Sequence, residues 1–319
     1  MHTCEIIIYT TCFIRVSDGD ILAPVKIFWD PEGREVDSLG RKGFLRVTDG
    51  DTPYVSMSMR MLSIDTPEVH YPGNQKPSKQ DANLGQLAEW IDKRKAPVSH
   101  GLGDYLYPKL ATGRAGALQE EQGNQATEAF RNLLNDKLTL PSGRKRELFL
   151  YAADEHFDQY GRLLAYMAPN YTAKERETMS RKERATFNLL MVESGWAASF
   201  PIYPSIPRVI DLVMLQEAAK SAFAGKKGAW ADPMTLTGYE FRMCVKLHDV
   251  TKRLLGGKKL ARSEREEWIS RYCVDMTTRE VFFPQDYFKV IPYNRIFVWP
   301  DDISEAVGKM NLLPAGTSA

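Results

Sequence analysis

The sequence predicts an α+β fold, in which strands and helices occupy separate stretches of the chain. Residues 5–47 are rich in β-branched and aromatic residues, as in "EIIIYTTCFIRV", and short β-prone runs continue to Val69. Later stretches place apolar residues at helical spacing. Past Trp230 the chain combines a basic helical run with an aromatic, β-prone segment. A length of 319 residues leaves room for about two domains.

Composition limits the class of protein. Hydrophobic residues make up 43% of the chain and charged residues 26%, which is typical of a soluble globular protein. The net charge of +1 shows no overall basic excess, so any contact with nucleic acid must come from a local patch. The four cysteines are scattered, which disfavours a disulfide framework or a zinc site. The N-terminal stretch has no signal-peptide pattern and no stretch approaches the length of a membrane span, so we expect an intracellular, cytoplasmic protein.

The helical elements follow in order along the chain. From Asp81, the residues Leu84, Leu87 and Ile91 recur at helical spacing, with Asp81 as the expected N-cap. Residues 96–116 are rich in Gly and Pro, and we assign no helix to them. A helix is predicted over "NQATEAFRNLLND". The segment "RELFLYAADEHFDQYGRLLAYMA" predicts a β-hairpin, and helices follow at about 185–195 and 211–225.

The motif Asp-Gly-Asp occurs twice, in "FIRVSDGD" at 13–20 and in "FLRVTDGD" at 44–51. By itself each copy predicts a hairpin turn, because Gly tolerates positive φ and Asp bonds its own backbone. Only the second copy is followed by "RMLSIDTPE" and, about a hundred residues later, by "DQYGR". We therefore interpret Asp18 and Asp20 as turn residues only.

These three motifs, in this order, resemble the signature of the staphylococcal (micrococcal) nuclease, or thermonuclease-like, family. The similarity extends to "GNQATEAF", "NLLMVESGWA" and "LQEAAKSAFAGKKGAW", and covers about 43–231 with an insertion at about 74–120. The resemblance implies an OB-type five-stranded β-barrel with flanking helices. The predicted domains are an N-terminal β extension (1–42), the nuclease-like domain (43–235) and a C-terminal α+β accessory region (236–319).

The resemblance also implies a metal site. Strand pairing is expected to bring Asp51 and Asp65 together, and two neighbouring carboxylates repel unless a cation neutralises them. Hard oxygen ligands suit Ca²⁺. The implied calcium ligands are Asp51, Asp65 and the Thr66 carbonyl, with Asp49 supporting through a bound water.

The implied catalytic residues are Arg60, Glu68 and Arg162. Glu68 is the candidate general base or water-positioning group, and the two arginines present planar donor forks to phosphate oxygens. Taken singly, each arginine is more often a solvated strand or turn residue; their joint order favours the site. The implied substrate contacts are Tyr160 and Tyr203.

The function predicted from the resemblance is a Ca²⁺-dependent endonuclease that cleaves DNA, RNA or both and leaves 3′-phosphates. The alternative is a non-catalytic nucleic-acid-binding or scaffold protein on the same fold. Three positions depart from the family pattern. Pro53 stands where the family usually has an apolar strand residue, Gln159 replaces a phosphate-contacting lysine, and Pro201 replaces a substrate-side tyrosine. We expect the basic, aromatic C-terminal region either to add substrate contacts or self-association, or to complete the hydrophobic core.

Overall fold

A computed structural model describes residues 41–316, apart from the side chains of 153–155. Residues 1–40 of the predicted N-terminal extension, with Asp18 and Asp20, lie outside the described residues. The described residues belong to one compact unit. The predicted boundary at 235/236 stays a prediction.

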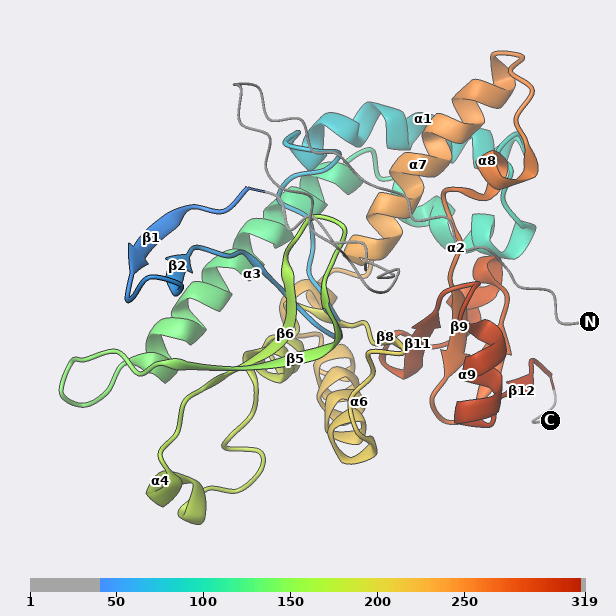
Figure 1. Ribbon diagram of the computed structural model, residues 1–319. Helices are drawn as coiled ribbons and strands as arrows, with labels where there is room; N and C mark the ends of the chain where they lie inside the picture. The colour runs from blue at the N-terminus through green and yellow to red at the C-terminus, as the bar shows by residue number, and fades with distance from the viewer. Residues whose placement is uncertain (1–40, 317–319) are drawn as a thin grey trace, which may run out of the picture. The chain divides into compact units, whose positions relative to one another are not determined.

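The described chain is a mixed α+β structure (Figure 1). The helices are α1 (Asp81–Asp92), α2 (His100–Leu110), α3 (Ala115–Leu138), α4 (Ala173–Thr178), α5 (Phe187–Glu193), α6 (Val209–Ala224), α7 (Gly238–Leu255), α8 (Arg262–Glu266) and α9 (Ile303–Met310). The strands are β1 (Phe44–Val47), β2 (Pro53–Val55), β3 (Met59–Met61), β4 (Ile64–Asp65), β5 (Leu148–Phe157), β6 (Leu163–Pro169), β7 (Ala198–Ser199), β8 (Ile202–Tyr203), β9 (Tyr272–Asp275), β10 (Glu280–Phe282), β11 (Arg295–Val298) and β12 (Leu313–Pro314). No helix within residues 41–316 is long and apolar enough to cross a bilayer.

The predicted five-stranded barrel is not closed in this structure. The relevant strands form three separate sheets, β1-β2, β3-β6-β5 and β4-β7, and the first sheet pairs with neither of the others. Pro53 begins β2, where its missing N–H removes a donor that a central strand would need. The apolar residues of β1 and β2 are correspondingly exposed, among them Phe44 at 65% and Leu45 at 63%.

The helical spacing of apolar residues located α1, α3, α5 and α6. Helix α2 was not predicted, because residues 96–116 are rich in Gly and Pro. Ser99 caps it by accepting from the Leu102 amide at 3.4 Å. Leu102, Leu106 and Leu110 lie four residues apart on one face, and all three are fully buried. Burial of this apolar stripe stabilises a helix whose two glycines and Pro108 disfavour it locally.

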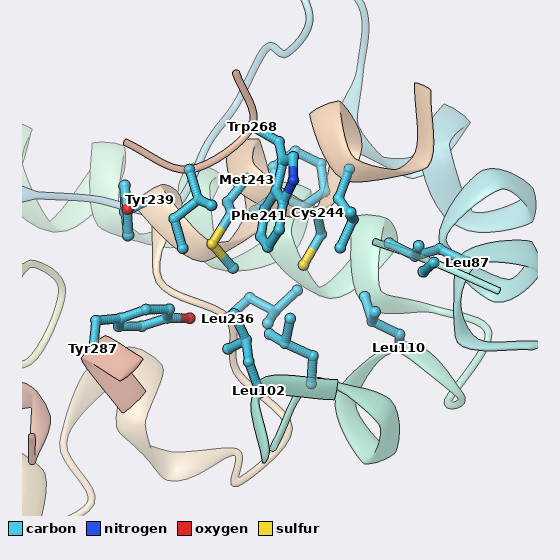
Figure 2. Packing of buried hydrophobic residues seen from close by; sticks show 14 of the residues in the cluster. Leu87, Leu102, Leu110, Leu236, Tyr239, Phe241, Met243, Cys244, Trp268 and Tyr287 are labelled. Atoms are coloured by element: carbon cyan, nitrogen blue, oxygen red, sulfur yellow. The ribbon is translucent and has the colours of Figure 1, made fainter. Parts of the chain in front are cut away.

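The largest hydrophobic core joins the insertion to the C-terminal region. Side chains of α1, α2 and α7 converge there (Figure 2), and Trp268, Cys273 and Tyr287 complete it. The described C-terminal residues therefore complete the core of the protein. This agrees with the second of our two expectations for the region. The basic run on and after α7 is partly neutralised, because Arg253 pairs with Glu264 and Glu267.

Asp81 caps a different helix from the one predicted. Helix α1 begins at Asp81 with Gln80 as its N-cap, and the Asp81 carboxylate instead accepts from the amides of Gly116 and Ala117 at 2.6 and 3.2 Å, in the first turn of α3. This carboxylate satisfies amides that have no partner within the helix, and it favours the positive end of the α3 dipole.

We therefore expect Asp81→Ala to lower the free energy of unfolding by about 1–2 kcal/mol. Urea unfolding measures the loss, and faster amide hydrogen exchange at Gly116 and Ala117 would assign it to α3. The exposed Asp92 provides the control variant, Asp92→Ala, which should leave these two amides unchanged. Equal exchange in both variants would contradict the cap.

Candidate functional site

Two short strands place Arg60 and Asp65. Arg60 lies in β3, whose parallel partner β6 sets Arg60 opposite Leu164. A turn with Ser63 at φ 59° leads into β4, where Asp65 pairs with Ala198 of β7. Asp65 is 3% exposed, whereas the Arg60 side chain keeps 37% of its surface. The turn thus buries the carboxylate and leaves the guanidinium accessible.

The Asp65 carboxylate has nitrogen donors on both oxygens. Its Oδ2 accepts from the backbone amide of Tyr239 at 2.6 Å. Its Oδ1 accepts from Arg242 Nη2 at 2.9 Å and from Arg60 Nη2 at 3.4 Å. Charge-assisted bonds of this kind compensate for the burial of an ionised group.

Glu68 follows Asp65 on a loop that helix α3 supports from behind. A β-carbon on Gly123 would lie 2.6 Å from the Glu68 carbonyl oxygen, so only glycine permits this approach. The Gln119 amide, in the orientation that satisfies both neighbours, accepts from the Glu68 N–H at 2.7 Å. Burial raises the pKa of the Glu68 carboxyl above its usual range, although its ion pair with Arg242 opposes the shift.

Arg242 joins the two carboxylates through different nitrogens. It projects from α7, pairs with Asp65 and Glu68, and keeps 22% of its side-chain surface. Burial lowers the pKa of its guanidinium, but the two carboxylates outweigh burial and leave that pKa above its ordinary value. Sequence reasoning missed this residue; its signal was weak, being one arginine between the buried Phe241 and Met243 in a basic run.

Arg162 and Tyr160 lie at the tip of the β5–β6 hairpin. Asp158 Oδ1 accepts the amides of Tyr160 and Arg162, both at 3.0 Å, and Oδ2 pairs with the Arg162 guanidinium at 2.7 Å. Burial works against the Asp158 carboxylate, but these bonds from Tyr160 and Arg162 keep its pKa below the ordinary value. Gly161, at φ 67°, allows the turn. Asp158 thus fixes the direction of Arg162.

The hairpin tip adjoins the strand that carries Arg60. Arg162 directly precedes β6, and Leu164, two residues further along, is the β6 residue opposite Arg60. Burial raises the pKa of Tyr71, and the charges of Arg242, Glu68 and Tyr160 all act on it. Tyr160 is 70% exposed and Arg162 34% in its side chain, so a ligand can reach both.

The structure does not place the other predicted residues at this site. Strand β8 pairs with β11 in the C-terminal sheet, whose strand order is β12-β10-β9-β11-β8. Tyr203 is therefore 5% exposed and packs in a cluster with Val274 and Ile296, so as placed it is no substrate contact. Asp49 and Asp51 lie exposed in the turn between β1 and β2, where Thr52 donates to Asp51 at 3.2 Å and the pKa of Asp49 is lowered, chiefly by its hydrogen bond with Thr52.

A family model described as staphylococcal nuclease homologue matches residues 58–232. The chain belongs to the staphylococcal nuclease homologue family. The matched range contains Arg60, Asp65, Thr66, Glu68 and Arg162, so the resemblance seen in the motifs is confirmed. The matched range begins after Asp49 and Asp51.

A curated relative of this nuclease homologue is "Endonuclease YhcR" of Bacillus subtilis (strain 168). The two are 23% identical over 271 residues, which is 82% of this chain but 16% of the relative. The chain thus spans about a sixth of the length of that protein.

The calcium ligands implied by the family do not form a site in this nuclease homologue as folded. A β-carbon on Gly238 would lie 2.4 Å from the Thr66 carbonyl oxygen and 2.7 Å from Asp65 Oδ2, so the start of α7 covers both groups. Within the described part of the chain, no group of three or more His, Cys, Asp or Glu side chains is arranged to hold a metal ion. Ca²⁺ takes six to eight oxygen ligands, and this arrangement does not fit it.

Proposed function

We propose that this protein is a nuclease that hydrolyses phosphodiester bonds of DNA, RNA or both. The observation that carries the proposal is the placement of two arginines on neighbouring parts of the β3-β6-β5 sheet, with a carboxylate close to one of them. Arg60 lies in β3 and Arg162 directly precedes β6. Glu68 shares Arg242 with Asp65, the carboxylate that Arg60 contacts. Membership of the staphylococcal nuclease homologue family supports the proposal.

Hydrolysis requires that water attacks phosphorus and that the 5′ oxygen leaves. A water oxygen, oriented by Glu68, forms a bond to phosphorus while one of its protons passes to the Glu68 carboxylate. The P–O5′ bond breaks, and the leaving oxygen takes a proton from solvent, which gives a 3′-phosphate and a 5′-hydroxyl, as the family resemblance implies. The five-coordinate intermediate carries extra negative charge on its equatorial oxygens. The guanidinium groups of Arg60 and Arg162 can donate to those oxygens, and preorganised donors of this kind are among the largest contributions to catalysis.

Calcium dependence is implied by the family resemblance alone. It does not enter the chemistry above, because Asp65 and Glu68 as placed face arginine and backbone amide donors instead of an open metal site.

Digestion assays test the proposal. We expect the wild-type protein to cleave supercoiled plasmid, single-stranded DNA or RNA, and to leave ends that polynucleotide kinase phosphorylates at the 5′-hydroxyl without prior phosphatase treatment. Parallel reactions with Ca²⁺, Mg²⁺ and EDTA define the metal requirement. Tight binding to all three substrates without cleavage in any reaction would instead identify the non-catalytic alternative.

A further inference from the structure

We infer that Arg242, together with the first turn of α7, serves as a built-in cation that holds Asp65 and Glu68 in place of calcium. The inference rests on the proposed nuclease function for its activity measurement, and on the geometry alone for its metal-binding measurement. It makes Arg242 a positioning residue, because it acts on the reaction through the two carboxylates.

Charge balance is the first step. Asp65 and Glu68 contribute two negative charges, and Arg242 and Arg60, both paired with Asp65, contribute two positive charges. The amide of Tyr239 adds the partial positive charge of a helix N-terminus. The charges of these ion pairs therefore already balance, and they offer a divalent cation little electrostatic attraction.

The local geometry of α7 explains how its first turn reaches this position. The cap residue Thr237 accepts from the Glu240 amide, and the Glu240 side chain returns to the Thr237 amide, so the capping box leaves the Tyr239 amide free for Asp65. Gly238 has no side chain to hold the helix away from Thr66. Arg242 lies one turn further along, where its two terminal nitrogens reach separate carboxylates.

Helix α7 is fixed in this position by the core of the protein. Tyr239, Phe241, Met243 and Cys244 are all buried in the largest hydrophobic cluster. Moving α7 aside to admit a cation would expose these side chains, which distinguishes the arrangement from a lid that opens. Arg242 therefore keeps its place beside the two carboxylates in the folded protein.

A calcium titration of the full chain tests the inference directly. We expect millimolar Ca²⁺ to leave the melting temperature of the wild-type protein unchanged and to give no binding heat by calorimetry. We also expect cleavage of a labelled oligonucleotide to persist in EDTA. In Arg242→Gln, two carboxylates lose their shared partner, so cleavage in EDTA should fall about 100-fold or more, and Ca²⁺ should now raise the melting temperature. Arg242→Lys, which keeps the charge, should recover part of the EDTA-resistant activity.

Arg253 supplies the matched control. It lies on the same helix, donates hydrogen bonds to two carboxylates, Glu264 and Glu267, and has a longer ion pair with Asp249 at 4.0 Å. It keeps 25% of its side-chain surface, close to the 22% of Arg242. Arg253→Gln should therefore keep EDTA-resistant cleavage and remain insensitive to Ca²⁺.

Two results separate the failure of this inference from failure of the nuclease proposal. Saturable Ca²⁺ binding to the wild-type protein, with cleavage abolished by EDTA, would overturn the inference and leave a calcium-dependent nuclease. Absence of cleavage under every condition would overturn the nuclease proposal, and the calcium response of the wild type would still decide the role of Arg242 without any variant. An Arg242→Gln protein that folds and keeps wild-type cleavage in EDTA would also overturn the inference.

Discussion

Glu68→Ala and Arg162→Ala are each expected to lower turnover at least about 100-fold while the protein remains folded. In the proposed mechanism, Glu68→Ala removes the carboxylate that orients water, and Arg162→Ala removes the guanidinium that Asp158 holds at the hairpin tip. Arg60→Ala should have an effect of the same order. Because these groups act on the transition state, the loss should appear in kcat and in kcat/KM alike.

Steady-state cleavage of a fluorescent oligonucleotide measures these effects, and circular dichroism confirms the fold. Arg181 provides the control, since it is exposed and, within residues 41–316, forms its ion pair with Asp211 alone. Arg181→Ala should cleave at close to the wild-type rate. Wild-type turnover in a folded Glu68→Ala protein would remove Glu68 from the mechanism.

Glu240→Gln is expected to produce the largest loss of stability, about 3–5 kcal/mol at neutral pH. The Glu240 carboxylate is 1% exposed and lies between Arg295 at 3.4 Å and Lys109 at 3.6 Å, with Tyr105 donating at 2.8 Å. Removing its charge leaves two buried cations without a counter-charge. The same helix carries Arg242, so this network also anchors the candidate site.

The pH dependence of this effect has a defined sign. Burial opposes ionisation, but Lys109 and Arg295 lower the pKa of Glu240 to about 2, below the ordinary value of 4.5. A lowered folded-state pKa contributes stability that is fully present above the unfolded value and is lost as pH falls toward the folded value. The difference between wild type and Glu240→Gln should therefore be constant above about pH 5 and shrink between about pH 4.5 and 2.

Urea unfolding at a series of pH values measures this difference. Glu175 is the informative control, because its pKa is also lowered to about 2, chiefly by its hydrogen bonds with Arg146, but its side chain keeps 38% of its surface, against 1% for Glu240. Solvent screening should leave Glu175→Gln with a much smaller loss than Glu240→Gln. Equal losses in the two variants would refute the importance of burial.

The sequence by itself determined the features that depend on short stretches of chain. Apolar spacing located four helices, and the "DQYGR" turn placed Arg162 at a hairpin tip, because the Asp158 and Gly161 geometry is local. The order of motifs identified the family and brought Arg60 and Glu68 forward as candidates.

Only the tertiary structure decided which distant groups meet. Arg242 reaches Asp65 across 177 residues, and no local pattern distinguishes it from the other arginines of a basic run. Packing likewise made Asp81 a cap for α3 and buried Tyr203 in the C-terminal sheet. Local backbone preferences set the elements, whereas the apolar faces that those elements bury against one another set the partners of each charge, and that burial depends on the whole chain.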